Sequence, residues 1–271
     1  MKILVLGSNG WLGGLFYDYL EERGVDVANC THHDINAFQI LEPDIDVVVN
    51  FAASTNIDWC EKNKNRTFWN NVLGAVNIAK VCKMAGAKYV FISSACIFQS
   101  KDKDDIKFED SVPQPGCFYT ETKLMAEKLI REIDPNALIV RPRLPISEIP
   151  HPRNTLNKLA NYDNLINCQE SITIVEDFIP RLYELIKKGK TGTFNIVNEG
   201  TISPAEIGIF MLHKFIPYTK SDLDEQIRSQ GKASRVSTIV GSHYGYLPPI
   251  RKRIIEVVNK WRSLYETKNR L

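Results

Sequence analysis

The chain has 271 residues, enough for one large α/β unit or for a main domain with a smaller lobe. Its 34 lysines and arginines nearly balance 32 aspartates and glutamates, which excludes the strongly basic surface typical of proteins that bind nucleic acid or membranes. We also see no signal peptide and no membrane-spanning stretch. The six cysteines lack metal-ligand spacing. These features predict a cytoplasmic protein with reduced thiols and no metal site.

Strands and helices alternate through the first half of the chain. Short runs rich in Val, Ile or Phe predict strands at Lys2–Leu6, Asp26–Asn29, Asp46–Phe51, Lys88–Ser93 and Ala137–Arg141. Apolar residues at helical spacing predict helices at Trp11–Arg23, Arg66–Met84 and Phe118–Ile133. This alternation is typical of the α/β class. It predicts a Rossmann-type doubly wound parallel sheet whose ligands bind beyond the carboxyl ends of the strands.

The alternation stops after Arg141, where proline-rich segments begin. We therefore predict an NAD(P)-binding Rossmann domain over residues 1–142, to which residues 174–190 return. A further strand is expected at Thr193–Val197. Residues 143–173 and 191–271 are predicted to form a smaller substrate-binding lobe.

The first predicted strand ends in glycines spaced three apart. Gly7 permits a tight turn, Gly10 lets a pyrophosphate approach the backbone, and Gly13 lets the next helix pack closely. Phosphates favour the N–H groups and the dipole at a helix N-terminus. Glycine-rich turns also occur without a ligand, so the position between strand and helix supports the prediction. The predicted cofactor-binding residues of this turn are Gly7, Asn9, Gly10, Trp11, Leu12 and Gly13.

Tyr119 and Lys123 are four residues apart at the start of a predicted helix and so share one face. We expect the lysine ammonium to stabilise the phenolate and to ease proton transfer near neutral pH. Ser94 ends the fourth predicted strand, where it can donate a second hydrogen bond to a carbonyl oxygen held by Tyr119. Together with the glycines, this order of residues favours a reductase over an incidental Tyr-Lys pair.

On these residues the chain resembles an extended short-chain dehydrogenase/reductase of the nucleotide-sugar branch, which includes dTDP-4-dehydrorhamnose reductase and GDP-fucose synthase. It is most similar to the bifunctional 3,5-epimerase/4-reductases of UDP-rhamnose synthesis. The segments that carry this likeness are Asn56–Glu61, Ser94–Phe98, Phe118–Met125, Arg143–Ser147 and Pro152–Asn154.

The resemblance implies Ser94, Tyr119 and Lys123 as the catalytic triad, with the tyrosine and lysine also contacting the cofactor. It implies that the backbone of Asn50–Ala53, in particular Ala52 and Ala53, lines the cofactor. Asn71 matches a recurrent family asparagine, although a hydrogen bond inside a helix explains it equally well. The substrate-binding residues predicted from family position and charge are Thr55, Arg143, Asn154 and Arg235.

Cys96 is two positions after Ser94. An extended segment would direct both side chains into one pocket. By resemblance, plain reductases carry tyrosine here and epimerase-reductases carry cysteine. Epimerisation removes a proton beside a ketone through an enolate, so we predict Cys96 as an acid/base; a small buried thiol is the alternative. Lys158 is the candidate for the second acid/base, and His151 is the fallback.

The predicted second strand is not followed at once by the acid that holds the ribose diol in NAD enzymes. His32 or His33 can instead donate to a 2′-phosphate, which favours NADPH and leaves NADH open. Asp34 resembles an adenine-contacting residue, and a turn-capping role suits it equally well.

These features predict an NADPH-dependent enzyme that converts UDP-4-keto-6-deoxy-D-glucose to UDP-L-rhamnose, with a nucleotide-diphosphate 4-keto-6-deoxy sugar as its partner. One alternative is a reductase alone, acting on a dTDP- or GDP-sugar. Another is a non-catalytic NADP-binding regulatory subunit. The nucleotide base and the oligomeric state, a homodimer included, are left open.

Overall fold

The computed structural model describes residues 1–30, 44–229 and 237–269. The chain divides into two compact units. The first comprises Met1–Ile97, Pro115–Arg141 and Leu182–Phe194, and the second comprises Phe98–Gln114, Pro142–Arg181 and Asn195–Leu271. The second unit therefore includes residues 98–114 and 174–181, for which the sequence predicts a place in the first domain.

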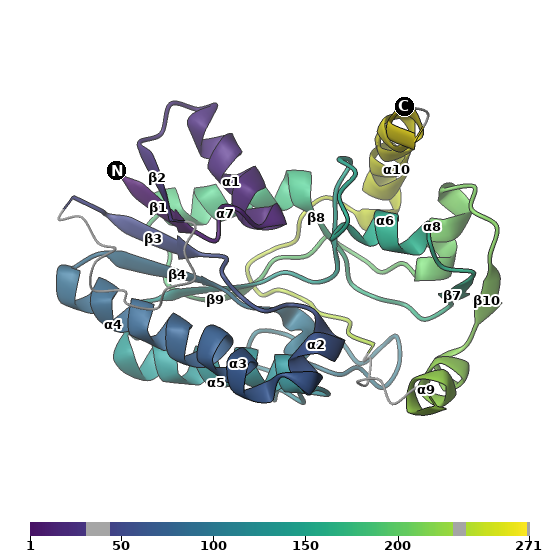
Figure 1. Cartoon of the computed structure of the whole chain (residues 1–271), viewed down its shortest axis with the longest axis horizontal. Coiled ribbons are helices and arrows are strands. Elements are labelled where there is room, and N and C mark those ends of the chain that lie inside the picture. The colour runs from purple at the N-terminus through teal and green to yellow at the C-terminus, as the bar shows by residue number, and fades with distance from the viewer. Residues whose placement is uncertain (31–43, 230–236, 270–271) are drawn as a thin grey trace. The chain divides into compact units, whose positions relative to one another are not determined.

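A six-stranded sheet in the order β2-β1-β3-β4-β5-β9 forms the centre of the first unit (Figure 1). Its strands are β1 (Ile3–Leu6), β2 (Val27–Cys30), β3 (Val47–Asn50), β4 (Lys88–Ile92), β5 (Leu138–Arg141) and β9 (Gly192–Asn195). The pairs from β2 to β5 are parallel. Because the strand order reverses between β1 and β3, the expected ligand crevice lies outside the carboxyl ends of these two strands.

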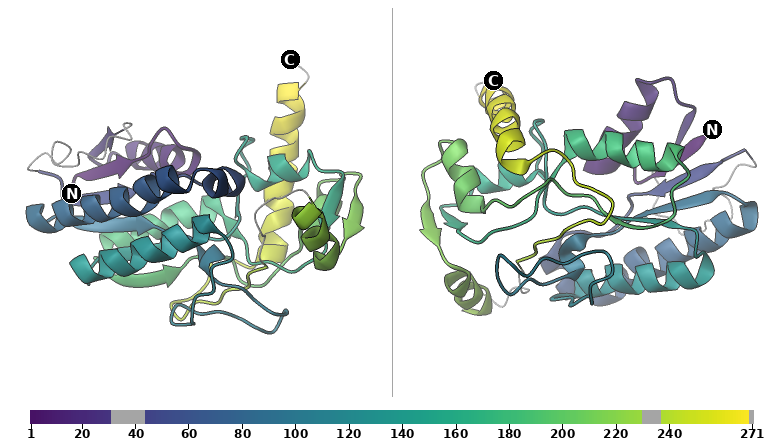
Figure 2. Two further views of the ribbon diagram at one scale, coloured as in Figure 1. Left: turned by 60° about the horizontal axis from the view of Figure 1, so that its bottom comes forward. Right: turned by 180° about the vertical axis from the view of Figure 1, so that it is seen from behind.

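Helices cover both faces of this sheet, as the predicted Rossmann-type fold requires. α1 (Trp11–Glu21) lies on one face, where Tyr19 packs edge-on against Tyr183 with ring centroids 6.0 Å apart. α4 (Ala75–Ala85) and α5 (Phe118–Ile133) lie side by side on the other face (Figures 1 and 2). The small buried residues of α4 and α5 let both helices approach the sheet and complete one apolar core.

The helix predicted at Arg66–Met84 contains a π-helical turn. The segment consists of α3 (Lys64–Phe68), η2 (Trp69–Gly74) and α4, and it follows the short helix α2 (Ile57–Lys62). Asn71 in η2 is buried; its Oδ1 accepts from Ser54 N (2.8 Å), and its Nδ2 donates to Ser54 O (3.0 Å). π turns occur frequently at functional sites. This one lies where the helix binds the segment that follows β3.

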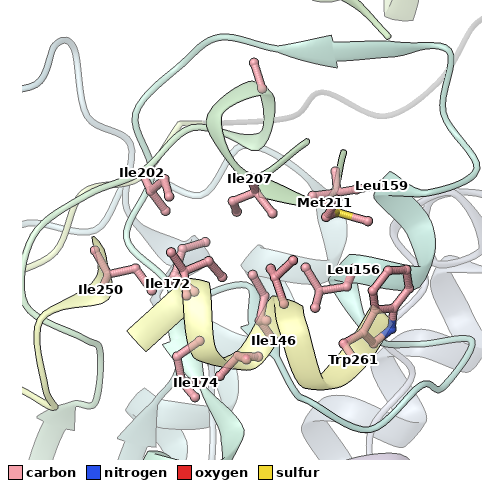
Figure 3. Close-up of a cluster of buried hydrophobic side chains, with 14 of the residues drawn as sticks. Ile146, Leu156, Leu159, Ile172, Ile174, Ile202, Ile207, Met211, Ile250 and Trp261 are labelled. Atoms are coloured by element: carbon pink, nitrogen blue, oxygen red, sulfur yellow. The ribbon is translucent and has the colours of Figure 1, made fainter. Parts of the chain in front are cut away.

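The second unit has a separate hydrophobic core. Its elements are β6 (Pro145–Ile146), α6 (Thr155–Leu159), β7 (Asn164–Ile166), β8 (Thr173–Ile174), α7 (Val175–Lys187, which continues into the first unit), α8 (Pro204–Phe210), β10 (Ile216–Tyr218), α9 (Lys220–Ser229) and α10 (Ile250–Asn269). Figure 3 shows Ile250 and Trp261 directed toward Ile146, Leu156 and Ile172 in this core. None of the described helices, α10 included, is long and apolar enough to cross a membrane.

Candidate active site

The turn between β1 and α1 packs so closely that two of its positions need glycine. Gly7 has φ +80°, and a Cβ there would lie 2.8 Å from the backbone nitrogen of Ala52. A Cβ on Gly13 would lie 2.3 Å from the carbonyl oxygen of Gly7. Gly7 therefore allows contact with the segment after β3, and Gly13 lets α1 begin directly against the turn.

The N-terminus of α1 is suited to an anion. Gly10 is its N-cap and supplies no side-chain cap, and the first turn of the helix has no acidic residue. The first N–H groups of a helix have no partner within the helix. At this end of α1 they include those of Leu12 and Gly13. The hydroxyl oxygen of Ser8 is buried and has no hydrogen-bond partner within the described ranges, while Asn9 is exposed. A pyrophosphate would satisfy such donors.

The segment after β3 presents backbone at the same edge of the sheet. The Asn50 side chain organises it: Nδ2 donates to Tyr89 OH (2.8 Å), and Oδ1 accepts from the Ala52 N–H (2.9 Å). Ala53 is partly buried, and Thr55 is exposed. Because β1 and β3 are parallel neighbours, this segment borders the glycine turn. Lining of a cofactor site by this segment stays a prediction.

Tyr119 lies in the first turn of α5 and is only 8% exposed. Burial raises the pKa of its phenol above the ordinary value. The neighbouring Cys96 thiol raises this pKa further, and a hydrogen bond with Ser94 lowers it. At neutral pH the side chain is therefore a neutral phenol, which is a proton donor.

Lys123 lies one turn after Tyr119 and is 2% exposed. Its ammonium donates to the carbonyl of Ile92 at the end of β4 (2.7 Å) and lies 4.4 Å from the centroid of the Phe91 ring. Burial lowers the pKa of Lys123 to about 8, and the nearby Glu127 carboxylate opposes that effect. In this structure burial dominates the titration of the phenol and raises its pKa, so stabilisation of the phenolate by Lys123 stays a prediction.

Cys96 lies in a 3-10 turn, η3 (Ala95–Ile97), and not in the predicted extended segment. The alternation of side chains along a strand therefore does not apply to it. The Cys96 N–H donates to the Ser94 hydroxyl (3.2 Å), which folds the turn back on the serine. Its thiol is close enough to Tyr119 to raise the pKa of the phenol. Ser94, Cys96 and Tyr119 thus gather at the end of β4 through a tight turn.

Glu127, a buried charged residue next to this site, was not predicted from the sequence. Glu127, one turn after Lys123, accepts from Arg141 Nε (2.9 Å), from Arg141 Nη2 (2.5 Å) and from the Ser93 hydroxyl. A usable signal was present. Tyr119, Lys123 and Glu127 recur at four-residue intervals and therefore lie on one helical face.

The predicted substrate residues of the second unit have structural partners. Arg143 is buried, and its Nη2 donates to Glu170 Oε2 (2.6 Å). Asn154 caps α6 and donates to the carbonyls of Ser147 (2.7 Å) and Ile149 (2.9 Å). These contacts explain both residues without a substrate, so substrate binding by Arg143 and Asn154 stays a prediction.

The candidates for the second acid/base are Lys158, which is exposed on α6, and His151, whose Nδ1 accepts from Arg153 N (3.0 Å). His32, Asp34 and Arg235 lie outside the described residues. Within the described ranges, no cluster of three or more His, Cys, Asp or Glu side chains could hold a metal ion.

The chain matches one protein family and several known proteins of nucleotide-sugar metabolism. The model of the RmlD substrate binding domain family matches residues 1–218. A bifunctional dTDP-4-dehydrorhamnose 3,5-epimerase/dTDP-4-dehydrorhamnose reductase of Arabidopsis thaliana is 32% identical, and the match covers 76% of this chain and 73% of the relative. A trifunctional Arabidopsis UDP-glucose 4,6-dehydratase/UDP-4-keto-6-deoxy-D-glucose 3,5-epimerase/UDP-4-keto-L-rhamnose-reductase is also 32% identical over 76% of this chain. The match spans only 33% of that longer protein.

Two solved structures resemble the fold. The L780 UDP-rhamnose synthase of Acanthamoeba polyphaga mimivirus has a TM-score of 0.86 at 26% identity, with 96% of this chain and 99% of that chain covered. A dTDP-4-dehydrorhamnose reductase of Bacillus anthracis, solved in complex with NADP, has a TM-score of 0.81 at 21% identity, with 96% and 98% covered.

Proposed function

The chain belongs to the RmlD substrate binding domain family, and from this premise we propose that it is an NADPH-dependent 3,5-epimerase/4-keto-reductase that converts UDP-4-keto-6-deoxy-D-glucose to UDP-L-rhamnose. The observation that carries the proposal is the buried Tyr119 phenol, with Ser94 hydrogen-bonded to it and Cys96 beside it. Two Arabidopsis relatives whose names combine epimerase and reductase activities support the pairing of both reactions.

The glycine turn and the start of α1 suit the pyrophosphate of NADPH, since they offer N–H groups, the Ser8 hydroxyl and no acidic side chain. The loop Ala52–Ala53 would line the adjoining ribose. When bound, NADPH supplies the hydride that reduces C4 of the sugar. The Bacillus anthracis reductase of the same fold, solved with NADP, supports this choice of cofactor.

Tyr119 donates the proton that the reduced C4 oxygen requires. Its raised pKa keeps the phenol protonated at neutral pH, so the proton is available as negative charge develops on the oxygen. Ser94 places a second hydroxyl at this oxygen, and preorganised donors of this kind stabilise developing charge. The Lys123 ammonium has three donor hydrogens, of which one is used on the Ile92 carbonyl. The others are available to the cofactor ribose and the phenol.

The same two hydroxyl groups serve epimerisation. A base removes the proton from C3 or C5, and the electron pair of that C–H bond forms the enolate, whose negative oxygen is bound by Ser94 and Tyr119. Cys96 is assigned one side of this exchange. Lys158, with His151 as the fallback, is assigned the return of a proton to the opposite face of the carbon.

Solvent deuterium incorporation tests this function. Without NADPH, the protein should incorporate deuterium from D2O at C3 and C5 of UDP-4-keto-6-deoxy-D-glucose, as measured by NMR and mass spectrometry. Cys96→Ala should abolish the exchange yet still reduce a pre-epimerised 4-keto sugar in a single turnover. Cys168→Ala removes another partly buried thiol and is the matched control, with exchange at the wild-type rate.

Each other outcome contradicts the bifunctional assignment. Reduction of a pre-epimerised dTDP- or GDP-sugar without any exchange would identify a reductase alone. NADPH binding with neither reaction would identify a regulatory subunit, although such a subunit has no need for Ser94, Tyr119 and Lys123. Wild-type exchange by Cys96→Ala would remove the role of the thiol.

A further inference from the structure

A buried ion pair lies directly behind the proposed active site. Glu127 and Arg141 are 4% and 5% exposed, and two hydrogen bonds join the guanidinium to the carboxylate. Neither residue is used in the reaction as described above. A buried ion pair is weak evidence for stability, because desolvation offsets its attraction, so its position calls for another explanation.

This ion pair is connected to the strand end that carries the serine. Glu127 accepts a hydrogen bond from Ser93, the residue before Ser94, and the Ser93 N–H donates to Val140 O (2.7 Å) on β5. Lys123, on the same helix, holds the Ile92 carbonyl. α5 thus holds Ile92, the last residue of β4, through an ammonium and the next residue, Ser93, through a carboxylate, immediately before Ser94.

The ion pair also lies within the electrostatic reach of Lys123. Residues four apart on a helix are neighbours, with Cβ atoms about 5–6 Å apart. Glu127 accordingly favours the charged form of Lys123, which burial disfavours. β4 presents the Ile92 carbonyl and the Phe91 ring to the ammonium.

Other charged or titratable groups packed on α5 engage different parts of it. Glu61 of α2 accepts from the Phe118 N–H (2.6 Å), and Cys60 and Cys96 act on the Tyr119 phenol. Asn71 of η2, which is neutral, donates to Thr122 (3.2 Å). Lys83 of α4 pairs with Asp134, after the last residue of the helix. Glu127 is therefore the carboxylate placed to act on Lys123.

We infer that Glu127 is a positioning residue for the proposed reaction, which supplies the counter-charge for the buried Lys123 and fixes, through Ser93, the strand end that presents Ser94. This inference rests on the proposed function for its catalytic meaning. The electrostatic effect of Glu127 on Lys123 exists in the protein without cofactor, so it can be measured even if the protein turns over no substrate.

The test is an NMR titration of lysine side chains in the full, cofactor-free protein labelled with 13C-lysine, with the Lys123 signal assigned from its loss in Lys123→Met. Glu127→Gln should lower the pKa of Lys123 by about 1 pH unit, since an opposite charge at this range is removed. Glu184→Gln is the matched control. It removes a carboxylate from an exposed lysine pair four residues apart (2.5 Å) and should leave the Lys123 signal unchanged.

Glu127→Gln leaves Arg141 buried without its counter-charge and can fail to fold. The double variant Glu127→Gln/Arg141→Met removes both charges and should lower the pKa of Lys123 in the same direction but by less, because the positive charge of Arg141 is lost together with the carboxylate. The alkaline fall in NADPH affinity should move to lower pH by the same interval as the Lys123 pKa in each variant that folds. An unchanged Lys123 titration in either variant overturns the inference. A shifted titration in a protein that turns over no keto-sugar keeps the electrostatic role and rejects the proposed function.

Discussion

NADPH affinity should fall at alkaline pH because the buried Lys123 loses its charge. Burial lowers its pKa to about 8, so about nine-tenths of the side chain is ammonium at pH 7 and about one-tenth at pH 9. If only the ammonium form binds well, the Kd for NADPH should rise about tenfold between pH 7 and pH 9 and about tenfold again by pH 10.

Fluorescence titration of the cofactor-free protein with NADPH across pH 6 to 10 measures this dependence. Two other groups do not account for a rise in this range. Phosphate monoesters complete their ionisation near pH 6, and the raised pKa of Tyr119 keeps the phenol neutral. Lys123→Met should bind weakly at every pH with no alkaline fall. Lys188→Met, which removes an exposed lysine, should keep the wild-type profile.

The lowered pKa of Lys123 also determines how folding stability changes with pH. The folded protein holds Lys123 at a pKa below its unfolded value, so between about pH 8 and pH 10 the unfolded chain binds more protons, and stability contributed by this group rises with pH. Below about pH 8 its burial cost is fully present.

A wild-type Kd for NADPH that stays constant from pH 6 to 10 would refute the reasoning, because it would mean that the charge of Lys123 contributes nothing to binding.

Three further changes test other parts of the site. Tyr119→Phe should reduce turnover at least about 100-fold and leave the Kd for NADPH within about twofold, since it removes only the proton donor; stopped-flow reduction and fluorescence binding measure both. Gly13→Ala should weaken NADPH binding at least about tenfold, because its Cβ would lie 2.3 Å from the Gly7 carbonyl oxygen; unchanged binding would contradict that packing. Asn71→Leu should lower the free energy of unfolding by about 2–3 kcal/mol in urea titrations, because it leaves the Ser54 backbone unpaired, whereas a loss below about 0.5 kcal/mol would mean that water replaces these bonds.

Strong local patterns made the first unit predictable. β1 is a run of four buried apolar residues that ends at Gly7, and the predicted bounds of α5, Phe118–Ile133, match those observed. Each pattern is local, because burial on both faces of a parallel strand or on one face of a helix determines it. The second unit lacked such signals. α6 has five residues and β8 has two, which is too short for periodicity to distinguish a helix from a strand.

The order of residues along the chain predicted which residues of the candidate site lie together. The contacts that depend on tertiary packing were not predicted. The sequence analysis placed Cys96 near Tyr119 by assuming an extended segment with alternating side chains. In the structure the thiol lies near Tyr119, but a 3-10 turn brings it there. Asn71 was left between two explanations, and the structure shows its amide on the Ser54 backbone and on Thr122. Those contacts depend on the π turn, which has no simple sequence pattern.

Buried charge distinguishes the residues of the first unit from those predicted for substrate binding in the second. Lys123 is buried, and its hydrogen bond to the Ile92 carbonyl leaves further donors for a ligand. Arg143 is buried too, but Glu170 accepts its guanidinium, and the same Glu170 oxygen accepts from Thr238 N (3.0 Å). The guanidinium has five N–H donors, so this pairing fixes the orientation of Arg143 without using every donor. A substrate diphosphate would therefore meet an arginine that Glu170 already holds in one orientation, and substrate binding by Arg143 stays a prediction.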